Sequence, residues 1–294
     1  MYQVVVLDDE ALGNHWLSNK GTSGVVLSDE VFRVIEIKAI DLAEDVRGRL
    51  SFAPLVNVVD QTGSTNADLM TDPHTCHQQV LIAMHQHSGA GRRGSQWASP
   101  LGGNLYLSAG WHFGVSLRRV AVLPLIVAAR VADEIESLLP SAIQLKWPND
   151  LFCDGKKFGG ILVESQTLSD GVIAAVIGVG INVNTTPAEV RVHRPITSLS
   201  EQTGALVDLQ AVAEAVTLGI FLACQDVASS STYDWHGAWS KRDLLLGRQV
   251  TLDSPTLSGG VARGLSEDGG LRVEHQYGIE TLYAGEVSLG ALEQ

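Results

Sequence analysis

The sequence has few cysteines and few basic residues, and both shortages exclude classes of protein. Its 294 residues include three cysteines, at positions 76, 153 and 224, which are widely spaced and form no CxxC pair. A disulfide framework or a zinc-ribbon site is therefore excluded as the basis of the fold. Lysine and arginine total 20 against 33 acidic residues, a formal net charge of −13. Such a chain does not bind nucleic acid through bulk electrostatics, and an anionic substrate needs a local cluster of positive charge.

Long hydrophobic runs are also missing. The longest one, residues 120–129, is flanked by arginines and is too short to span a bilayer, which predicts a core helix. The amino terminus has neither a basic start nor an apolar run of signal-peptide length. We therefore expect a cytoplasmic protein with no membrane contact.

The first 50 residues differ from the rest of the chain. They hold nine acidic and five basic residues, and no pair of helical periods is joined by a tight turn. A helix-turn-helix that reads DNA also needs lysines and arginines facing phosphates, which are sparse here. Residues 1–50 are therefore predicted to be an acidic N-terminal extension without a DNA-binding unit.

The remainder predicts two domains, in line with the chain length. Over residues 51–245, strands are expected at 55–60, 80–86, 105–111, 143–147, 151–153, 158–166 and 172–184, and helices at 64 onward, 124–139, 209–228 and 233–241. This mixture indicates an α+β fold. Residues 246–294 contain short strands separated by glycine turns, at 249–253, 260–265, 271–275 and 278–284. That pattern is typical of a small β-barrel.

Charge is distributed unevenly in the first half of the larger domain. No acidic residue lies between Asp72 and Asp133, whereas five arginines do, at positions 92, 93, 118, 119 and 130. This predicts an anion-binding region. The alternative is a core-rich stretch that simply carries few charges.

A glycine-rich loop over residues 88–97 contains two of these arginines, Arg92 and Arg93, and ends at Trp97. Glycines allow backbone N–H groups to approach an anion, and arginine side chains match carboxylate or phosphate oxygens in pairs. The loop matches neither the P-loop pattern nor GxGxxG after a strand. A flexible surface loop is the alternative.

Two further segments are candidates for a site. Of only six lysines, three lie close together, at 146, 156 and 157, around the run Lys-Trp-Pro-Asn-Asp at 146–150. Gly178 and Gly180 lie in a predicted buried strand, where a missing side chain lets another group approach the backbone. The alternatives are a hairpin with exposed basic residues and a β-bulge. His85 and His87 share one strand face, but no third ligand accompanies them, so hydrogen-bonded strand histidines are favoured over a metal site.

Taken together, these segments resemble the biotin–protein ligases. The matching pieces occur in the order of that family and cover residues 55–290: GSTN at 63–66, Gln86 ahead of GRRG at 91–94 with Trp97, SP at 99–100, GNLYLS at 103–108, KWPNDL at 146–151, Lys157, GGILVE at 159–164, GVGIN at 178–182 and GEVSL at 285–289. A chance match does not explain this resemblance, because the Lys-Trp-Pro-Asn-Asp run and the Gly-Arg-Arg-Gly-x-x-Trp run occur together. No comparable match covers residues 1–50.

The resemblance implies a mixed-sheet catalytic domain of the biotin/lipoate-ligase type followed by an SH3-like barrel. It also implies two half-reactions, in which biotin and MgATP give biotinyl-5′-AMP and pyrophosphate, and a lysine of a biotin carboxyl carrier protein or domain then takes the biotin. Both steps move negative charge on carboxylate and phosphate oxygens. Positioned cations and backbone N–H groups can stabilise that charge, so the absence of a Ser–His–Asp constellation is expected.

Roles for individual residues follow from the same resemblance. A biotin site would comprise Ser64, Thr65, Asn66, Gln86, Gly89, Ala90, Gly91, Arg92, Lys157, Gly160 and Gly178. An ATP and adenylate site would comprise Arg92, Arg93, Trp97, Lys146, Asn149, Lys157 and Asn182. In the catalysis itself, Arg92 would neutralise developing charge, Lys157 would bridge the biotin carboxylate and the α-phosphate, and Asp150 would either orient biotin or accept the proton of the incoming amine. No protein metal site is implied, and Mg2+ is expected with ATP.

The loop departs from the family pattern at two positions. The usual run is Gly-Arg-Gly-Arg-Arg-Gly-Arg, and Ala90 and Ser95 replace its first and last arginines. This concerns retention of the adenylate, not the type of reaction. Two other functions remain open from sequence: a lipoate or octanoate ligase or transferase, which shares the fold, and a non-enzymatic biotin sensor. Sequence predicts neither the oligomeric state nor the identity of the carrier protein.

Overall fold

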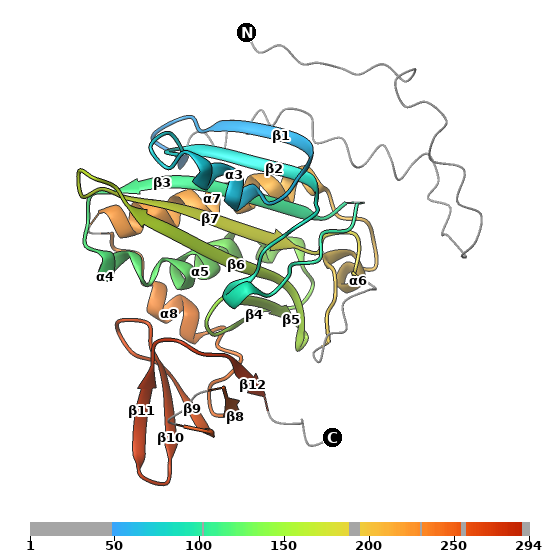
Figure 1. Ribbon diagram of the computed structural model, residues 1–294. Coiled ribbons are helices and arrows are strands. Elements are labelled where there is room, and N and C mark those ends of the chain that lie inside the picture. Colours follow the sequence, from blue (N-terminus) through green and yellow to red (C-terminus); the bar gives the residue numbers. More distant parts are fainter. Residues whose placement is uncertain (1–48, 102, 188–194, 230, 254–256, 290–294) are drawn as a thin grey trace, which may run out of the picture.

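A computed structural model describes residues 49–101, 103–187, 195–229, 231–253 and 257–289 (Figure 1). Except for its last two residues, the predicted N-terminal extension lies outside this part, so that expectation stays a prediction. The described residues form two sheets, one of seven strands and one of five.

The seven-stranded sheet is mixed, as the sequence predicts. Its strand order is β1-β2-β3-β7-β6-β5-β4, with β1 and β2 parallel and every other pair antiparallel. In that order the strands are β1 (Leu55–Thr62), β2 (Gln79–Gln86), β3 (Leu105–Phe113), β7 (Ile173–Ile181), β6 (Lys156–Thr167), β5 (Asp150–Cys153) and β4 (Ile143–Lys146).

Alternate residues of the central strands pack on opposite faces of this sheet. Ile173 and Ile177 of β7 belong to the main core, whereas Ala174 and Val176 belong to a smaller cluster that includes Leu69. Leu69 lies on α3 (Thr65–Thr71), while α5 (Leu123–Ile135) and α7 (Leu209–Ala228) supply the main core (Figure 1). Each face is therefore covered by helix, and α3 begins at the edge of a site on the smaller side.

Helix α7 is the one described helix that is long and apolar enough to cross a membrane by length and composition. Twelve of its residues are buried, and it contacts α5 and β3. Its apolar surface is therefore used in the core. Its start follows from local chemistry, because the Asp208 carboxylate accepts a hydrogen bond from the N–H of Gln210 at 2.9 Å.

The second sheet is antiparallel and small, consistent with the predicted SH3-like fold. Its order is β11-β10-β9-β8-β12, comprising β8 (Gln249–Leu252), β9 (Gly259–Leu265), β10 (Leu271–His275), β11 (Gly278–Leu282) and β12 (Val287–Leu289). The three-residue strand β12, which sequence did not predict, pairs with β8. The buried Trp147 connects the two sheets, because its indole N–H donates to the Gly269 carbonyl at 3.0 Å.

Most predicted helices and strands form within a few residues of their expected bounds, but some begin or end elsewhere. The helix expected over 124–139 ends at Ile135 and continues as a 3-10 turn, η3 (Glu136–Leu138). Strand β7 ends at Ile181 because Asn182 and Asn184 direct their side chains to loop backbone, donating to the carbonyls of Thr197 (3.0 Å) and Val207 (2.8 Å). Two short helices were not predicted, α4 (Leu117–Val120) and α6 (Leu199–Thr203), and the helix expected over 233–241 forms as the shorter α8 (Trp235–Ser240).

Candidate active site

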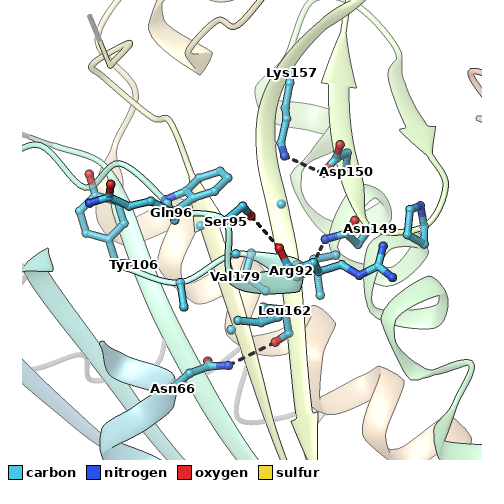
Figure 2. A pocket seen from close by; sticks show the side chains of 18 of the residues that line it. Asn66, Arg92, Ser95, Gln96, Tyr106, Asn149, Asp150, Lys157, Leu162 and Val179 are labelled. Atoms are coloured by element: carbon cyan, nitrogen blue, oxygen red, sulfur yellow. Dashed lines mark hydrogen bonds and ion pairs between the residues drawn. The ribbon is translucent and has the colours of Figure 1, made fainter. Parts of the chain in front are cut away.

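A cleft with a cavity of about 220 Å³ lies where the start of α3, the loop over residues 89–97, strands β5 to β7 and the second sheet meet (Figure 2). Most of the residues predicted for a site line it. They are Ser64, Thr65, Asn66, Gln86, Ala90, Gly91, Arg92, Trp97, Lys146, Asn149, Asp150, Lys157, Gly160 and Gly178. Segments as far apart in sequence as Ser64 and Val287 are therefore brought to one place.

The uncharged polar end of the cleft is built on the first turn of α3. Ser64 caps the helix by accepting from the N–H of Ala67 at 3.5 Å, and the N–H of Thr65 donates to Gln86 Oε1 at 2.9 Å. The first N–H groups of a helix have no partner within it, so these bonds fix where the helix begins. Thr65 and Asn66 are both buried, at 4% exposure each.

Gly178 explains how Asn66 fits against the sheet. The pairing of β3 with β7 is regular here, Ser108 opposite Gly178, so no β-bulge is present at this point. A Cβ on Gly178 would overlap the side-chain oxygen of Asn66. The glycine is therefore required by the close approach of Asn66, which in turn donates from Nδ2 to Glu164 Oε2 at 2.8 Å.

The glycine-rich loop is a tight hairpin closed by its own backbone. Gly91 N–H donates to the Ser95 carbonyl at 2.7 Å, and Trp97 N–H donates to the Gly89 carbonyl at 2.8 Å. Arg93 adopts the left-handed conformation, with φ 54°. The indole of Trp97 lies on the backbone of β7, where a Cβ on Gly180 would be 2.5 Å from the ring. These bonds give the loop a defined turn, while Ala90, Ser95 and Gln96 are exposed at the surface.

Three cations and a carboxylate form the charged end of the cleft. Lys157 Nζ lies 2.6 Å from Asp150 Oδ1 (Figure 2), and Lys146 is 3% exposed. Burial, assisted by the neighbouring Arg93, lowers the pKa of Arg92, while Asp150 and Glu286 oppose that shift. An arginine keeps its charge far above neutral pH, so Arg92 remains a cation in this cleft.

This arrangement can be compared with known proteins. Residues 55–182 match the model of the Biotin/lipoate A/B protein ligase family, and residues 245–290 match the Biotin protein ligase C terminal domain. The biotin–[acetyl-CoA-carboxylase] ligase of Paracoccus denitrificans is 32% identical over 244 residues, covering 78% of this chain and 98% of that protein. The chain belongs to the biotin–protein ligase family.

Other members of the biotin–protein ligase family agree. The bifunctional ligase/repressor of Escherichia coli is 30% identical over 73% of this chain and 67% of its own length. A biotin protein ligase from Aquifex aeolicus, solved in complex with biotin and ATP, superimposes with a TM-score of 0.68 at 29% identity, covering 80% of this chain and 98% of that one. Both the mixed sheet and the small C-terminal sheet are therefore features of a biotin–protein ligase.

Three residues predicted for the site lie outside the cleft lining of this biotin–protein ligase. Gly89 is buried behind the loop, where a Cβ would be 2.6 Å from the Trp97 carbonyl oxygen. Asn182 is 4% exposed and its amide binds the Thr197 carbonyl. Arg93 lines a neighbouring cavity of about 300 Å³, and its guanidinium lies 3.8 Å from Asp253 of the second sheet. Their contacts in this structure are to protein groups, and their roles toward biotin and ATP stay predictions.

The anion-binding region expected from the five arginines is wrong as a single region. Arg118 lies 3.6 Å from Asp268, Arg119 donates to the Ser229 carbonyl at 2.7 Å, and Arg130 forms an ion pair with Asp226 at 2.7 Å. Only Arg92 of the five lines the main cleft. The sequence shows few acidic residues near these arginines. It does not show that acceptors for them come from distant helices and from the second sheet.

Sequence reasoning missed several residues that line the cleft. Gly180 was one of the two noted strand glycines but was not assigned to the site, and it receives Trp97. Tyr106, whose hydroxyl donates to the Pro100 carbonyl at 2.9 Å, also lines it, and burial raises its pKa. Gly285, Glu286 and Val287 enter from the second sheet. The signal that could have found this segment was the GEVSL run, which the resemblance already included.

His85 is a hydrogen-bonded strand histidine, as predicted, whereas His87 follows the end of β2 and lies in a turn. His85 Nδ1 donates to the Ser99 carbonyl at 2.6 Å, and its ring meets that of His87 edge-on with centroids 5.2 Å apart. Over the described residues, no group of three or more His, Cys, Asp or Glu side chains could hold a metal ion.

Proposed function

We propose that this chain activates biotin with ATP, forming biotinyl-5′-AMP and pyrophosphate, and then transfers biotin to a lysine of a biotin carboxyl carrier protein or domain. One observation carries the proposal: the cleft joins an uncharged hydrogen-bonding end to an end with three cations. A ureido ring needs the first, and a carboxylate beside a triphosphate needs the second. Membership of the biotin–protein ligase family supports the same assignment.

The first step joins two anions. A biotin carboxylate oxygen attacks the α-phosphorus of ATP, the bond to the bridging oxygen breaks, and pyrophosphate leaves with the electron pair. Lys157 and Arg92 lie at the charged end and reduce repulsion between the anions. The ion pair between Lys157 and Asp150, at 2.6 Å, favours Asp150 as the group that holds the ammonium in position.

The second step needs no enzyme nucleophile. A neutral lysine amine of the carrier attacks the carbonyl carbon of the mixed anhydride, the bond from that carbon to the phosphate oxygen breaks, AMP leaves with the electron pair, and the new amide nitrogen loses its extra proton to solvent. Asn149, whose amide donates to the Ile161 carbonyl at 2.6 Å, and the buried Lys146 both line the cleft and would contact phosphate oxygens. Trp97, which lies on β7 in the lining of the cleft, would cover the adenylate.

Mg2+ would enter with ATP. It prefers a few carboxylate oxygens together with substrate phosphates and keeps several waters, so it needs no complete cage of protein ligands. Two carboxylates line the cleft, and since Asp150 pairs with Lys157, Glu286 is the one that would contact the magnesium ion. We place the reaction in the cytoplasm, because ATP and carrier domains are available there. No nucleic-acid role is proposed.

The test of this function is ATP–pyrophosphate exchange in the presence of either biotin or lipoate. We expect exchange that depends on biotin, followed by biotin transfer to an isolated carrier domain. Exchange with lipoate alone would favour the lipoate-ligase alternative. Binding of biotin without exchange would favour a non-enzymatic sensor.

Restoring the two missing loop arginines is expected to slow escape of the adenylate. Ala90 and Ser95 are both exposed, so arginines fit there, although Ser95 would lose its hydrogen bond to the Arg92 carbonyl at 2.8 Å. Each partly exposed contact is worth about 1 kcal/mol, and two independent ones would slow release about tenfold or more. The measurement is release of labelled biotinyl-AMP from wild type and from Ala90→Arg/Ser95→Arg. Equal release rates would show that these positions do not control retention.

A further inference from the structure

Ser108 is a buried serine whose hydroxyl lies between two residues at the polar end of the cleft. It is 0% exposed, within a strand that is otherwise apolar from Leu105 to Ala109. Its Oγ lies 2.6 Å from Thr65 Oγ1 and 2.6 Å from Asn66 Oδ1. It does not line the cleft itself, so any effect on a ligand must pass through these two neighbours.

The orientation of the Asn66 amide fixes where the Ser108 proton goes. Asn66 Nδ2 faces two acceptors, Glu164 Oε2 at 2.8 Å and the Leu162 carbonyl at 3.5 Å (Figure 2). Its oxygen must therefore face Ser108. An amide oxygen only accepts, so the single proton of the Ser108 hydroxyl is donated to Asn66.

This leaves Thr65 only one way to form its short contact with Ser108. Because the Ser108 proton is already used, the Thr65 hydroxyl must be the donor across the 2.6 Å between the two oxygens. Thr65 then has no proton left for Gln86 Oε1, 3.1 Å away, and that oxygen is occupied instead by the Thr65 backbone N–H. The remaining lone pairs of Thr65 Oγ1 are acceptors.

The amide of Gln86 is oriented by a separate contact. Its Nε2 donates to Ser99 Oγ at 3.1 Å, which places Oε1 toward Thr65. Both Thr65 Oγ1 and Gln86 Oε1 thus act as acceptors at this end of the cleft. A cyclic urea carries N–H donors, whereas a disulfide ring or an ether oxygen carries none.

We infer that Ser108 is a positioning residue that makes Thr65 an obligate acceptor and so selects ligands with a ring N–H at this point. This rests on the proposed function, since the N–H would belong to the ureido ring of biotin. Without Ser108, the Thr65 proton can turn either toward Gln86 Oε1 at 3.1 Å, which already accepts from the Thr65 N–H, or toward a ligand oxygen, and selection for N–H weakens.

The test measures ATP–pyrophosphate exchange for wild type and Ser108→Ala, with biotin and with two cyclic carbamate analogues in which one or the other ureido N–H is replaced by oxygen. The preference is the exchange rate with biotin divided by the rate with an analogue, and it is compared for the analogue that wild type uses less well. We expect this preference to be about fivefold to tenfold lower in Ser108→Ala than in wild type, which is the value of one hydrogen bond. The KM for biotin should rise by a similar factor, with kcat changed less than threefold. Thr217→Val is the control, since it removes another fully buried hydroxyl that bonds only to its own helix, at the Ala213 carbonyl.

The outcomes separate the two proposals. A preference in Ser108→Ala that stays within twofold of wild type overturns the role of Ser108. A wild type that exchanges pyrophosphate with no dependence on biotin overturns the proposed function, and this inference with it. If Ser108→Ala does not fold, Ser108→Cys replaces it, because a thiol keeps a weak donor at this position. The preference of Ser108→Cys for biotin should lie between that of wild type and no preference.

Discussion

Replacing Lys157 by alanine is expected to lower the rate of ATP–pyrophosphate exchange at least a hundredfold while leaving the fold intact. The ammonium lies at the charged end of the cleft, 2.6 Å from Asp150. Two charge-assisted hydrogen bonds to a carboxylate and an α-phosphate, made mainly in the transition state, are worth roughly 3–6 kcal/mol. The loss should therefore appear in kcat at saturating biotin and ATP.

The neighbouring lysine supplies a matched control for this experiment. Lys156 is exposed on the same strand and does not line the cleft, so Lys156→Ala removes the same charge without touching the site. We expect its exchange rate to match wild type. If Lys157→Ala keeps more than half of the wild-type rate with an unchanged circular dichroism spectrum, Lys157 is not the bridging cation.

The order of strands and helices could be predicted because it depends on local chemistry. Ser64 as a helix cap and the Asp154-Gly155 turn between β5 and β6 are properties of adjacent residues. The large core also follows from alternation of apolar residues along strands such as β7. The short elements β12 and α6 were missed because so short a segment carries no period of its own, whereas β5, equally short, was found because a turn signal bounds it.

The site could be predicted as a set of segments but not as a set of contacts. The strand glycines signalled a close approach, yet sequence did not show that Asn66 is the group that approaches Gly178 or that Trp97 lies on Gly180. The hydroxyl of Ser108, within an apolar strand, carried no signal. Its role depends on partners 42 and 43 residues away, and such pairings are decided by the register of β3 with its neighbours.

A methyl group added at Gly178 is expected to weaken biotin binding about tenfold to a hundredfold without unfolding the protein. The new Cβ of Gly178→Ala would overlap the oxygen of Asn66, and the nearest other atoms also belong to that side chain. The amide is the end of a rotatable side chain, so it can turn away at little cost to the fold. It then loses its bonds to Ser108, at 2.6 Å, and to Glu164, at 2.8 Å.

These losses concern binding of the ring and not the reacting atoms. The lost hydrogen bonds and a lost contact to the ligand together amount to about 1–3 kcal/mol of binding free energy. This corresponds to the expected tenfold to hundredfold loss of affinity for biotin. The KM for biotin should rise accordingly, with kcat close to wild type, the reverse of the result expected for Lys157→Ala. Gly63→Ala is the control, because a Cβ there meets no atom within 4 Å although the residue immediately precedes the Ser64 cap. A KM for Gly178→Ala within twofold of Gly63→Ala would show that Asn66 does not hold the ligand, and the uncharged end of the cleft would need another explanation.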